Sequence, residues 1–313
     1  MVKFMRSIPA GTFLVPMLLS ALLFTISPGL LQIGGVTEAF LGGGSMNFVI
    51  GLISFCSGIG IELKSLIQLL KRHGVLFVAK LILSVALGLG YVALFGQEGI
   101  FGISAVAFII TITSVNAALY VSLVDDFGTQ IDKAAFGLIS IFSIPVVPVL
   151  VYSLQGTAGI DLSPVINILI PLVIGIILGN LDPNFRDIFS GGVSLLIPVI
   201  GWKIGQTLNL MNAVQEVFVG LILAIIFYVV MSPLILVDTK LLKNDGLVPI
   251  SMSAVAAFSS SFPAIIAQTN PELQPYVTSA TAQILAVSLI TAIVTPMLTK
   301  KLLPSTHSIM QIE

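Results

Sequence analysis

The sequence predicts an all-α polytopic membrane protein in which ten transmembrane helices form two inverted five-helix repeats, with helices 4 and 9 broken. Composition is the first observation: 57% of the 313 residues are hydrophobic and only 9% are charged, whereas soluble domains carry about 25% charge. The second is that basic residues fall in alternate connections between the apolar segments. The third is that short motifs recur, in the same order, in both halves of the chain.

Ten apolar segments approach the roughly 20 residues that a membrane-spanning helix requires. Their centres fall near Leu22, Ile53, Ser84, Ile112, Ser143, Pro171, Ile200, Ile225, Phe258 and Leu289. The second, fourth, seventh and ninth are short or rich in Gly, Ser and Thr. We interpret the N-terminal run as a first span and not as a removed signal, because no small-residue cleavage site stands out.

The basic residues predict the orientation of the chain. Of the 13 Lys and Arg residues, all except Lys80 and Lys203 fall at the termini or in every second connection. They are Lys3, Arg6, Lys64, Lys71, Arg72, Lys133, Arg186, Lys240, Lys243, Lys300 and Lys301. Because basic connections stay in the cytoplasm, we expect both termini to be cytoplasmic.

Two stretches carry the internal repeat. The segment LVPMLLSALLFTISPG (14–29) resembles LIPLVIGIILGNLDPN (169–184), with prolines at the same two places. The motifs FLGG and GIGIEL of the first half correspond, in the same order, to FSGG and GQTLNL of the second. We therefore predict a first repeat over residues 1–155 and a second over 156–313, which an odd number of helices inverts in the membrane. Inverted repeats of this kind are typical of secondary transporters.

The repeat predicts where a substrate would bind, since such sites lie at broken helices near the midplane. The fourth segment contains TITSVNAALY (111–120), and its counterpart, ISMSAVAAFSSSFPAIIAQ (250–268), contains three serines before Pro263. Because Pro obstructs the preceding turn, we expect a break near Phe258–Pro263. Half-helices beginning near Asn116 and Phe262 would present free N–H groups to a carboxylate. Alternatively, the hydroxyls bond the preceding turns of intact helices.

These stretches, with several others, resemble the 2-keto-3-deoxygluconate permeases of the bacterial inner membrane. The resemblance rests on IPAGTFLVPML, SPG, FCSG, NAALY with FGT, LGNLDPNFRDIFS, LIP with GQTLNL, and SSSFP, which extend over nearly the whole chain. It implies symport of 2-keto-3-deoxygluconate with protons and a distant kinship to the bile acid:sodium symporter fold, with its ten helices and its crossing helices 4 and 9.

The chain departs from the pattern of that family at its polar centre. Family members have two glycines where this chain has Ala117 and Ala118, and an acidic residue where it has Thr113. They have Asn and Asp in place of Gln206 and Asn209, and no lysine in place of Lys203. The substrate and the coupling ion are therefore left open.

Ionisable residues within spans are functional candidates. Lys203 is either a partner for a substrate carboxylate or a side chain that reaches water, and we expect Lys80 to reach water at the cytoplasmic side. Every acidic residue falls in a loop or at a helix end, so we expect no buried carboxylate. We expect His73 and His307 to be solvated.

The site predictions combine these arguments. Substrate-binding candidates are Asn116, Ala117, Ser260, Ser261, Phe262, Gln206 and Lys203. Candidates for a coupling ion are Thr113, Ser114, Asn116, Ser259 and Gln283, and this ion would be a proton or sodium. No cofactor is expected, and neither the net charge of −1 nor the single cysteine, Cys56, indicates a nucleic-acid partner, an internal disulfide or a metal motif.

The sequence thus predicts a secondary active transporter of 2-keto-3-deoxygluconate or a related small sugar acid, working by alternating access in the lipid of the bacterial inner membrane. The alternatives are a sodium/proton antiporter, a carrier of another small organic anion, and a channel. An intramembrane enzyme would need a nucleophile–base pair or metal cluster at depth, which the sequence does not offer. The oligomeric state is left open.

Overall fold

The computed structural model describes residues 5, 11–27, 29, 31, 33–42, 46–129, 132, 135–155, 161–189, 191–206 and 210–303. Throughout these residues the protein consists of helices and their connections, with no strand, which confirms the all-α prediction. Lys3, Arg6, Pro28, Lys133, Asn209 and His307, which entered the predictions above, lie outside the described residues.

The first half contains eight described helices. They are α2 (Gly11–Ile26), α3 (Gly35–Leu41), α4 (Met46–Ile59), α5 (Leu63–Phe95), α6 (Ala105–Thr113), α7 (Ala117–Phe127), α9 (Phe136–Phe142) and α10 (Val146–Ser153). Gly96 ends the long α5 in a left-handed conformation (φ 66°) that glycine adopts without strain. Ser104 begins α6 by accepting a hydrogen bond from the amide of Ala107.

The second half contains seven described α-helices and three short turns of other helix types. They are α11 (Ser163–Leu181), α12 (Asn184–Phe189), α13 (Gly192–Gly205), α14 (Leu210–Leu236), the π-helical turn η1 (Val237–Leu241), α15 (Leu247–Met252), the 3₁₀ turn η2 (Ala257–Ser261), α16 (Phe262–Thr269), the 3₁₀ turn η3 (Pro271–Tyr276) and α17 (Val277–Leu302). Each of the ten predicted span centres lies in one of these helices or at a short break between two of them.

Six stretches of the described chain are long and apolar enough to cross a membrane. They are Leu70–Phe95, Ala105–Val124, Ser163–Leu181, Asn184–Gly205, Glu216–Leu241 and Pro271–Leu302. A seventh results if α3 and α4, which are bent by 58° relative to each other, form one span. The protein is therefore a multi-pass membrane protein, and the count of ten spans stays a prediction.

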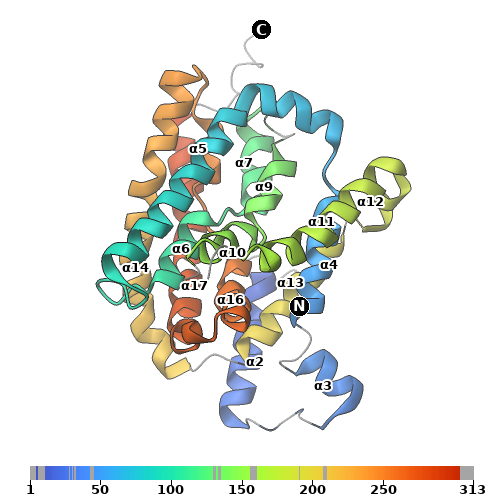
Figure 1. Cartoon of the computed structure of the whole chain (residues 1–313), viewed down its shortest axis with the longest axis vertical. Helices are drawn as coiled ribbons and strands as arrows, with labels where there is room; N and C mark the ends of the chain where they lie inside the picture. The colour runs from blue at the N-terminus through green and yellow to red at the C-terminus, as the bar shows by residue number, and fades with distance from the viewer. Residues whose placement is uncertain are drawn as a thin grey trace.

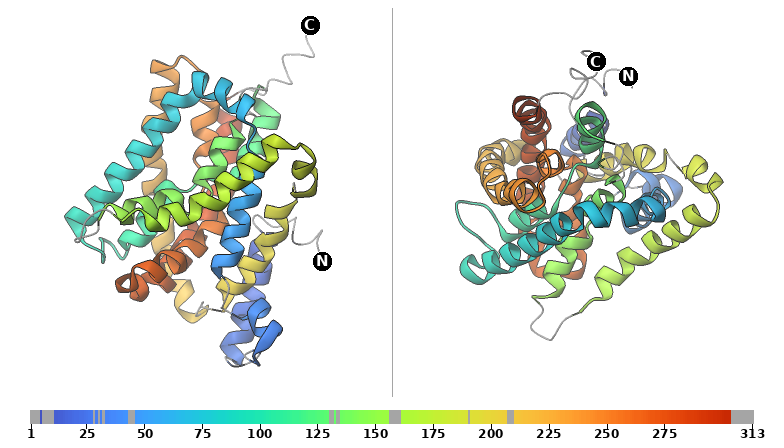
Figure 2. Two further views of the ribbon diagram at one scale, coloured as in Figure 1. Left: turned by 45° about the vertical axis from the view of Figure 1, so that its right-hand side comes forward. Right: turned by 90° about the horizontal axis from the view of Figure 1, so that it is seen from above.

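Helices α2, α4, α11 and α13 pack together in a group that we call the panel (Figure 1). Within it, α13 packs against α2 and α11 packs against α4; α2 and α13 run side by side in both views of Figure 2. Glycines make these approaches close. Gly205 lies against the carbonyl of Met17, and Gly58 lies against the carbonyl of Leu172, so neither position has room for a Cβ atom. Small residues allow this kind of backbone contact between membrane helices.

A second group, the core, contains α5, α6, α7, α14, α15 and α17 (Figure 1). Two of its segments are broken helices. Ser114–Asn116 separates α6 from α7, and residues 253–256 separate α15 from η2. The second break begins at residue 253, before the predicted Phe258–Pro263, and continues through the 3₁₀ turn η2 to the start of α16 at Phe262. The half-helix therefore begins where it was predicted, with Pro263 in its first turn, where a helix needs no amide donor.

Candidate functional site

The two breaks meet, and each supplies hydrogen bonds to the other. The amide of Asn116 donates to the carbonyl of Ala254 (2.7 Å), and the amide of Ala256 donates to the hydroxyl of Ser114 (3.2 Å). The hydroxyls of Ser114 and Ser259 share a hydrogen bond of 2.6 Å. We call this contact the crossing. In a membrane interior, unwound backbone is tolerated only where such partners replace the lost helical bonds.

Further hydroxyls from neighbouring helices complete the crossing. Thr291 and Thr295 of α17 bond the amide of Val255 and the carbonyl of Ser253, at 3.0 and 2.6 Å. Ser143 bonds the carbonyl of Val115 at 2.9 Å. The polar residues at these depths therefore have a structural task, which is to hold two broken helices together.

Asn116 has a second role at the start of α7. Its side-chain oxygen accepts a hydrogen bond from the amide of Leu119 (3.0 Å), which caps the half-helix. Within the described part of the chain, its side-chain amide nitrogen has no partner. The capped helix begins with Ala117, and both residues face a cavity.

This cavity, of about 590 Å³, lies between the panel and the core. Its volume falls within the roughly 300–1,000 Å³ that is common for small-molecule sites. Most of its wall is apolar, and its polar side chains come from the panel, from the core, from α12 and from α9 with the residue that follows it. They are Ser57, Asn116, Ser140, Ser143, Arg186 and Ser194. Such a wall, with a few polar groups, suits a small ligand of mixed polarity.

Arg186, on α12, is the cationic side chain of this wall. Its guanidinium donates to the side-chain oxygen of Asn180 (3.2 Å) and lies 3.6 Å from the carboxylate of Glu62. Its Nε atom is buried and, among the described residues, has no hydrogen-bond partner. From the sequence, Arg186 is expected only as one of the cations in the connections. The available signal was its place within LGNLDPNFRDIFS, the most specific of the quoted stretches.

Three of the predicted substrate residues lie behind the wall of the cavity. Ser260 and Ser261 are buried, and their hydroxyls bond the carbonyls of Ala257 and Phe258 within the same turn, both at 2.7 Å. Phe262, the first residue of α16, is also buried. The structure therefore brings Asn116 and Ala117 to the cavity and places these three residues beside it.

Lys203 and Gln206 lie at the end of α3. The ammonium of Lys203 donates to the carbonyls of Gly42 (2.7 Å) and Ala39 (3.3 Å), and the side-chain amide of Gln206 bonds the carbonyl of Leu41. A cation is favoured at the C-terminus of a helix, where carbonyls lack helical partners. Neither residue belongs to the wall of the cavity.

The predicted coupling-ion residues are only partly brought together. Ser114, Ser259 and Asn116 meet at the crossing. Thr113 bonds the carbonyls of Ile109 and Ile110 in its own helix. Gln283 bonds the carbonyl of Gly102 (2.9 Å) and the carboxylate of Glu216 (2.6 Å), so it lies apart from the crossing.

The sequence profile of the 2-keto-3-deoxygluconate permeases matches residues 2–307. The chain belongs to this family. A 2-keto-3-deoxygluconate permease 1 of Salmonella typhimurium is 35% identical over 95% of this chain and 93% of its own length. The permeases of Pectobacterium atrosepticum and of an Enterobacter species are 33% and 31% identical, over 88% and 93% of this chain and 88% and 90% of their own lengths. The predicted family is thereby confirmed, and with it a transporter and not an enzyme.

The structure contradicts the expectation that Lys80 reaches water at the cytoplasmic side. In this member of the permease family it does not reach water: its side chain is 0% exposed. The ammonium donates to the carbonyl of Ile112 (3.2 Å), contacts the sulfur of Met231 (3.5 Å) and lies 5.6 Å from the ring centre of Phe142. The expectation failed because hydropathy cannot show that α5 continues past Lys80 against the crossing.

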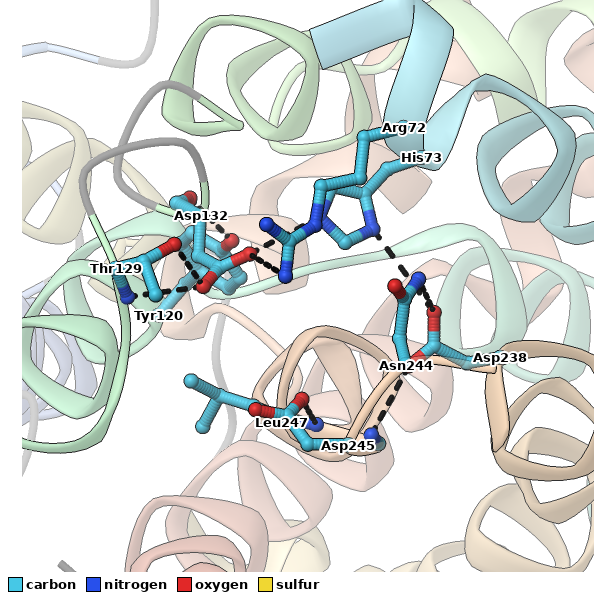
Figure 3. Close-up of polar contacts among 10 residues, drawn as sticks. Arg72, His73, Tyr120, Thr129, Asp132, Asp238, Asn244, Asp245 and Leu247 are labelled. Carbon is cyan, nitrogen blue, oxygen red and sulfur yellow. Dashed lines mark hydrogen bonds and ion pairs between the residues drawn. The ribbon is translucent and has the colours of Figure 1, made fainter. Parts of the chain in front are cut away.

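His73 is also buried, at 1% exposure, and two acidic residues are buried beside it. Its Nε2 atom lies 3.0 Å from the carboxylate of Asp132, and its Nδ1 atom lies 3.9 Å from that of Asp238 (Figure 3). Arg72 lies 3.8 Å from Asp132. We call these four residues the ionic cluster. It corrects two expectations, a solvated His73 and the absence of buried carboxylates.

The ionic cluster stabilises the charged form of Asp132. Burial raises the pKa of this carboxyl, but hydrogen bonds from His73 and Thr129 and the charge of Arg72 outweigh burial and lower the pKa to about 2. Asp238 accepts hydrogen bonds from the side chain of Asn244 (2.9 Å) and the amide of Gly246 (3.0 Å). The cluster joins α5 to the connection that follows α7 and to η1 itself. No residue of the cluster lines the cavity.

Proposed function

We propose that the protein is a symporter of 2-keto-3-deoxygluconate or a closely related sugar acid, driven by a proton or sodium gradient. Membership of the permease family supports the substrate class. The observation that carries the proposal is the cavity between the panel and the core, which unites Arg186, Asn116 and several hydroxyls. A sugar acid has one carboxylate and several hydroxyl groups, which match these partners.

The carboxylate of the substrate would bind near Arg186. A guanidinium forms strong charge-assisted hydrogen bonds with carboxylates, and its buried Nε atom is available for one. The side-chain amide of Asn116 would donate to the keto or hydroxyl oxygens, since its own oxygen is engaged in capping α7. The hydroxyls of Ser57, Ser143 and Ser194 would bind the remaining polar groups.

The packing of the panel supports the predicted inverted repeat. The motif alignment pairs Met17 with Leu172, and Gly58 with Gly205. In the structure, Gly205 lies against the carbonyl of Met17, and Gly58 lies against that of Leu172. Each contact is therefore the repeat equivalent of the other. The sequences of the two breaks also correspond to each other. TSVNAA in the first and SAVAAF in the second both have valine as their third residue.

Alternating access would then be a movement of the core against the panel, because the cavity lies between them. Arg186 and Glu62 stand beside the start of α5, on the side that the basic residues assign to the cytoplasm. The cavity would thus be the inward-facing one, in a bacterial inner membrane with both termini cytoplasmic. Lipid would surround the bundle.

Transport of labelled 2-keto-3-deoxygluconate into proteoliposomes tests the proposal. We expect saturable uptake under a pH gradient alone or a sodium gradient alone, and the effective gradient names the coupling ion. Exchange of internal for external substrate without any gradient measures substrate binding and movement separately from ion coupling. Absence of both uptake and exchange would overturn the proposed substrate, and other small carboxylates would then be compared in the same assay.

A further inference from the structure

Lys80 occupies an unusual position for a cation. It is fully buried in the part of α5 that packs against the crossing. None of the described acidic groups lies within ion-pair distance of its ammonium; its partners are the carbonyl of Ile112, the sulfur of Met231 and the ring of Phe142. A buried charge without a counter-ion is unfavourable and marks a functional site by default.

The carbonyl of Ile112 explains why a donor is needed there. In an unbroken helix this carbonyl would accept from the amide of Asn116. At the crossing, that amide donates instead to Ala254. Lys80 and Ser84 both donate to the vacated carbonyl, Ser84 at 3.1 Å. Because the neutral hydroxyl of Ser84 already satisfies it, the carbonyl does not require the charge of Lys80.

Among the described residues, the helices packed against α5 offer no second proton acceptor near Lys80: the titratable group of α10, Tyr152, is a phenol that already holds its proton. Neither α6 nor α9 contains a titratable side chain. On α14, Glu216 bonds Gln283 and Tyr228 bonds Thr295. On α5 itself, His73 belongs to the ionic cluster. A proton taken up at this depth therefore has Lys80 as its acceptor.

We propose that the amine of Lys80 carries the coupling proton of this transporter. The inference rests on the proposed function, since it takes the substrate to be an anion bound in the cavity. The cavity lies just across the crossing from Lys80. Asn116 of its wall follows Ile112 by one helical turn, and Ser140 and Ser143 flank Phe142.

Electrostatic attraction through a medium of low polarity would couple the two sites. A substrate carboxylate in the cavity favours the ammonium form of Lys80, and by reciprocity the ammonium form favours the bound anion. The amine gains one proton, with no other bond changed, when the anion binds from outside. It releases this proton to the cytoplasm after the anion leaves. The empty carrier returns neutral, so transport of a monovalent anion moves no net charge, and sodium is not needed.

The first test uses the unaltered protein. In detergent with a pH-indicating dye, addition of 2-keto-3-deoxygluconate should cause uptake of about one proton per bound substrate. In proteoliposomes, a gradient of one pH unit should support about tenfold accumulation, because a tenfold ratio of proton activity balances a tenfold ratio of substrate. Substrate exchange without proton uptake would overturn the role of Lys80 while leaving the proposed function intact. No exchange at all would overturn the proposed function first.

Variants then assign the proton to the residue. Lys80→Gln should retain exchange but lose substrate-induced proton uptake. Under the same pH gradient it should bring the internal and external substrate concentrations to equality, without accumulation. Lys80→Arg keeps a permanent charge and should also fail to accumulate substrate. If Lys80→Arg accumulates substrate as the unaltered protein does, Lys80 is a positioning residue. Lys64→Gln, at an exposed position of the same helix, is the matched control and should behave as the unaltered protein.

Discussion

The crossing and the ionic cluster are both buried polar centres that tie helices together, but they are built from different groups. The crossing uses hydroxyls and backbone amides, with hydrogen bonds such as the 2.6 Å contact between Ser114 and Ser259. The ionic cluster uses charged groups, with Asp132 held by His73 and Arg72. Neutral partners can satisfy broken helices without placing fixed charges beside a substrate. Charged partners hold segments together away from the wall of the cavity.

This comparison predicts that changes at the cavity side of the crossing affect binding more than stability, and that changes in the ionic cluster do the reverse. Asn116 should show the largest effect. We expect Asn116→Ala to abolish substrate binding, because both its cap and its free amide are lost. The loss of the cap alone should lower the free energy of unfolding by about 1 kcal/mol. Binding calorimetry and thermal unfolding in detergent measure the two effects.

Asn116→Ser separates the cap from the binding group, since serine also caps helices well. This variant should unfold like the unaltered protein and still fail to bind. Normal affinity in Asn116→Ser would show that the side-chain amide does not contact the substrate.

Arg186 should show the next largest effect on binding. Removing its charge in Arg186→Gln should weaken the affinity for a sugar acid by roughly 10- to 100-fold, as hydrogen bonds to charged groups contribute about 1.5–3 kcal/mol. The matched control is Arg72→Gln in the ionic cluster, which should leave the affinity unchanged. An equal loss of affinity in the two variants would mean that Arg186 acts through the long-range electrostatic field of the protein and not through contact with the substrate.

Asp132→Asn should lower stability and spare binding. The variant weakens hydrogen bonds from His73 and Thr129, at 3.0 and 2.6 Å, and we expect the free energy of unfolding to fall by about 2 kcal/mol. Thermal unfolding and substrate affinity should be measured on the same preparation. A large loss of affinity with unchanged stability would reverse the roles assigned to the two centres.

The pH dependence of stability tests the same carboxylate. The pKa of Asp132 is lowered from 3.8 to about 2 in the folded protein. A lowered pKa means that this group stabilises the fold above pH 3.8, and that its contribution is lost as the pH falls toward 2. Unfolding measured over this interval should therefore show a steeper decline for the unaltered protein than for Asp132→Asn. Parallel curves would argue against the ion pair.

The smallest effect is expected at Lys203. Because its ammonium bonds the carbonyls of Ala39 and Gly42 outside the cavity, Lys203→Met should change substrate affinity less than about threefold, below 1 kcal/mol. A selective loss of affinity for anionic substrates would restore the role that the sequence left open for this lysine.

The sequence predicted the elements of this fold better than their contacts. Apolar length located helical segments at nine of the ten predicted centres, and the tenth, Ser143, lies at the short break between α9 and α10. The Ser and Thr content of two segments indicated where helices break. Pro263 marked the start of α16 at the end of the second break, but it could not show that the break begins at residue 253, because proline is as compatible with a first turn as with an interruption. Lys80, His73, Asp132 and Asp238 were expected in water, since hydropathy gives the depth of a residue along a span but not the helices that cover it.

The candidate site was predicted in part for the same reason. Asn116 stood out as an amide within an apolar span, and it does line the cavity. Arg186 did not stand out, because a cation in a connection is ordinarily solvated. Its place in the wall depends on α12, a short helix that packs against α4. From the sequence, the hydroxyls of Ser260 and Ser261 look like ligand-binding groups. The structure shows instead that they donate hydrogen bonds to carbonyls of their own helical turn.

The glycine contacts of the panel have a mechanical consequence. Where backbone lies directly on backbone, as at Gly58 and Gly205, no flexible side chain is present to absorb displacement, and close-packed interiors have low compressibility. The two pairs of panel helices are therefore stiff against sliding along each other. We therefore expect deformation of the molecule to concentrate in the connections between the panel and the core and not within the panel.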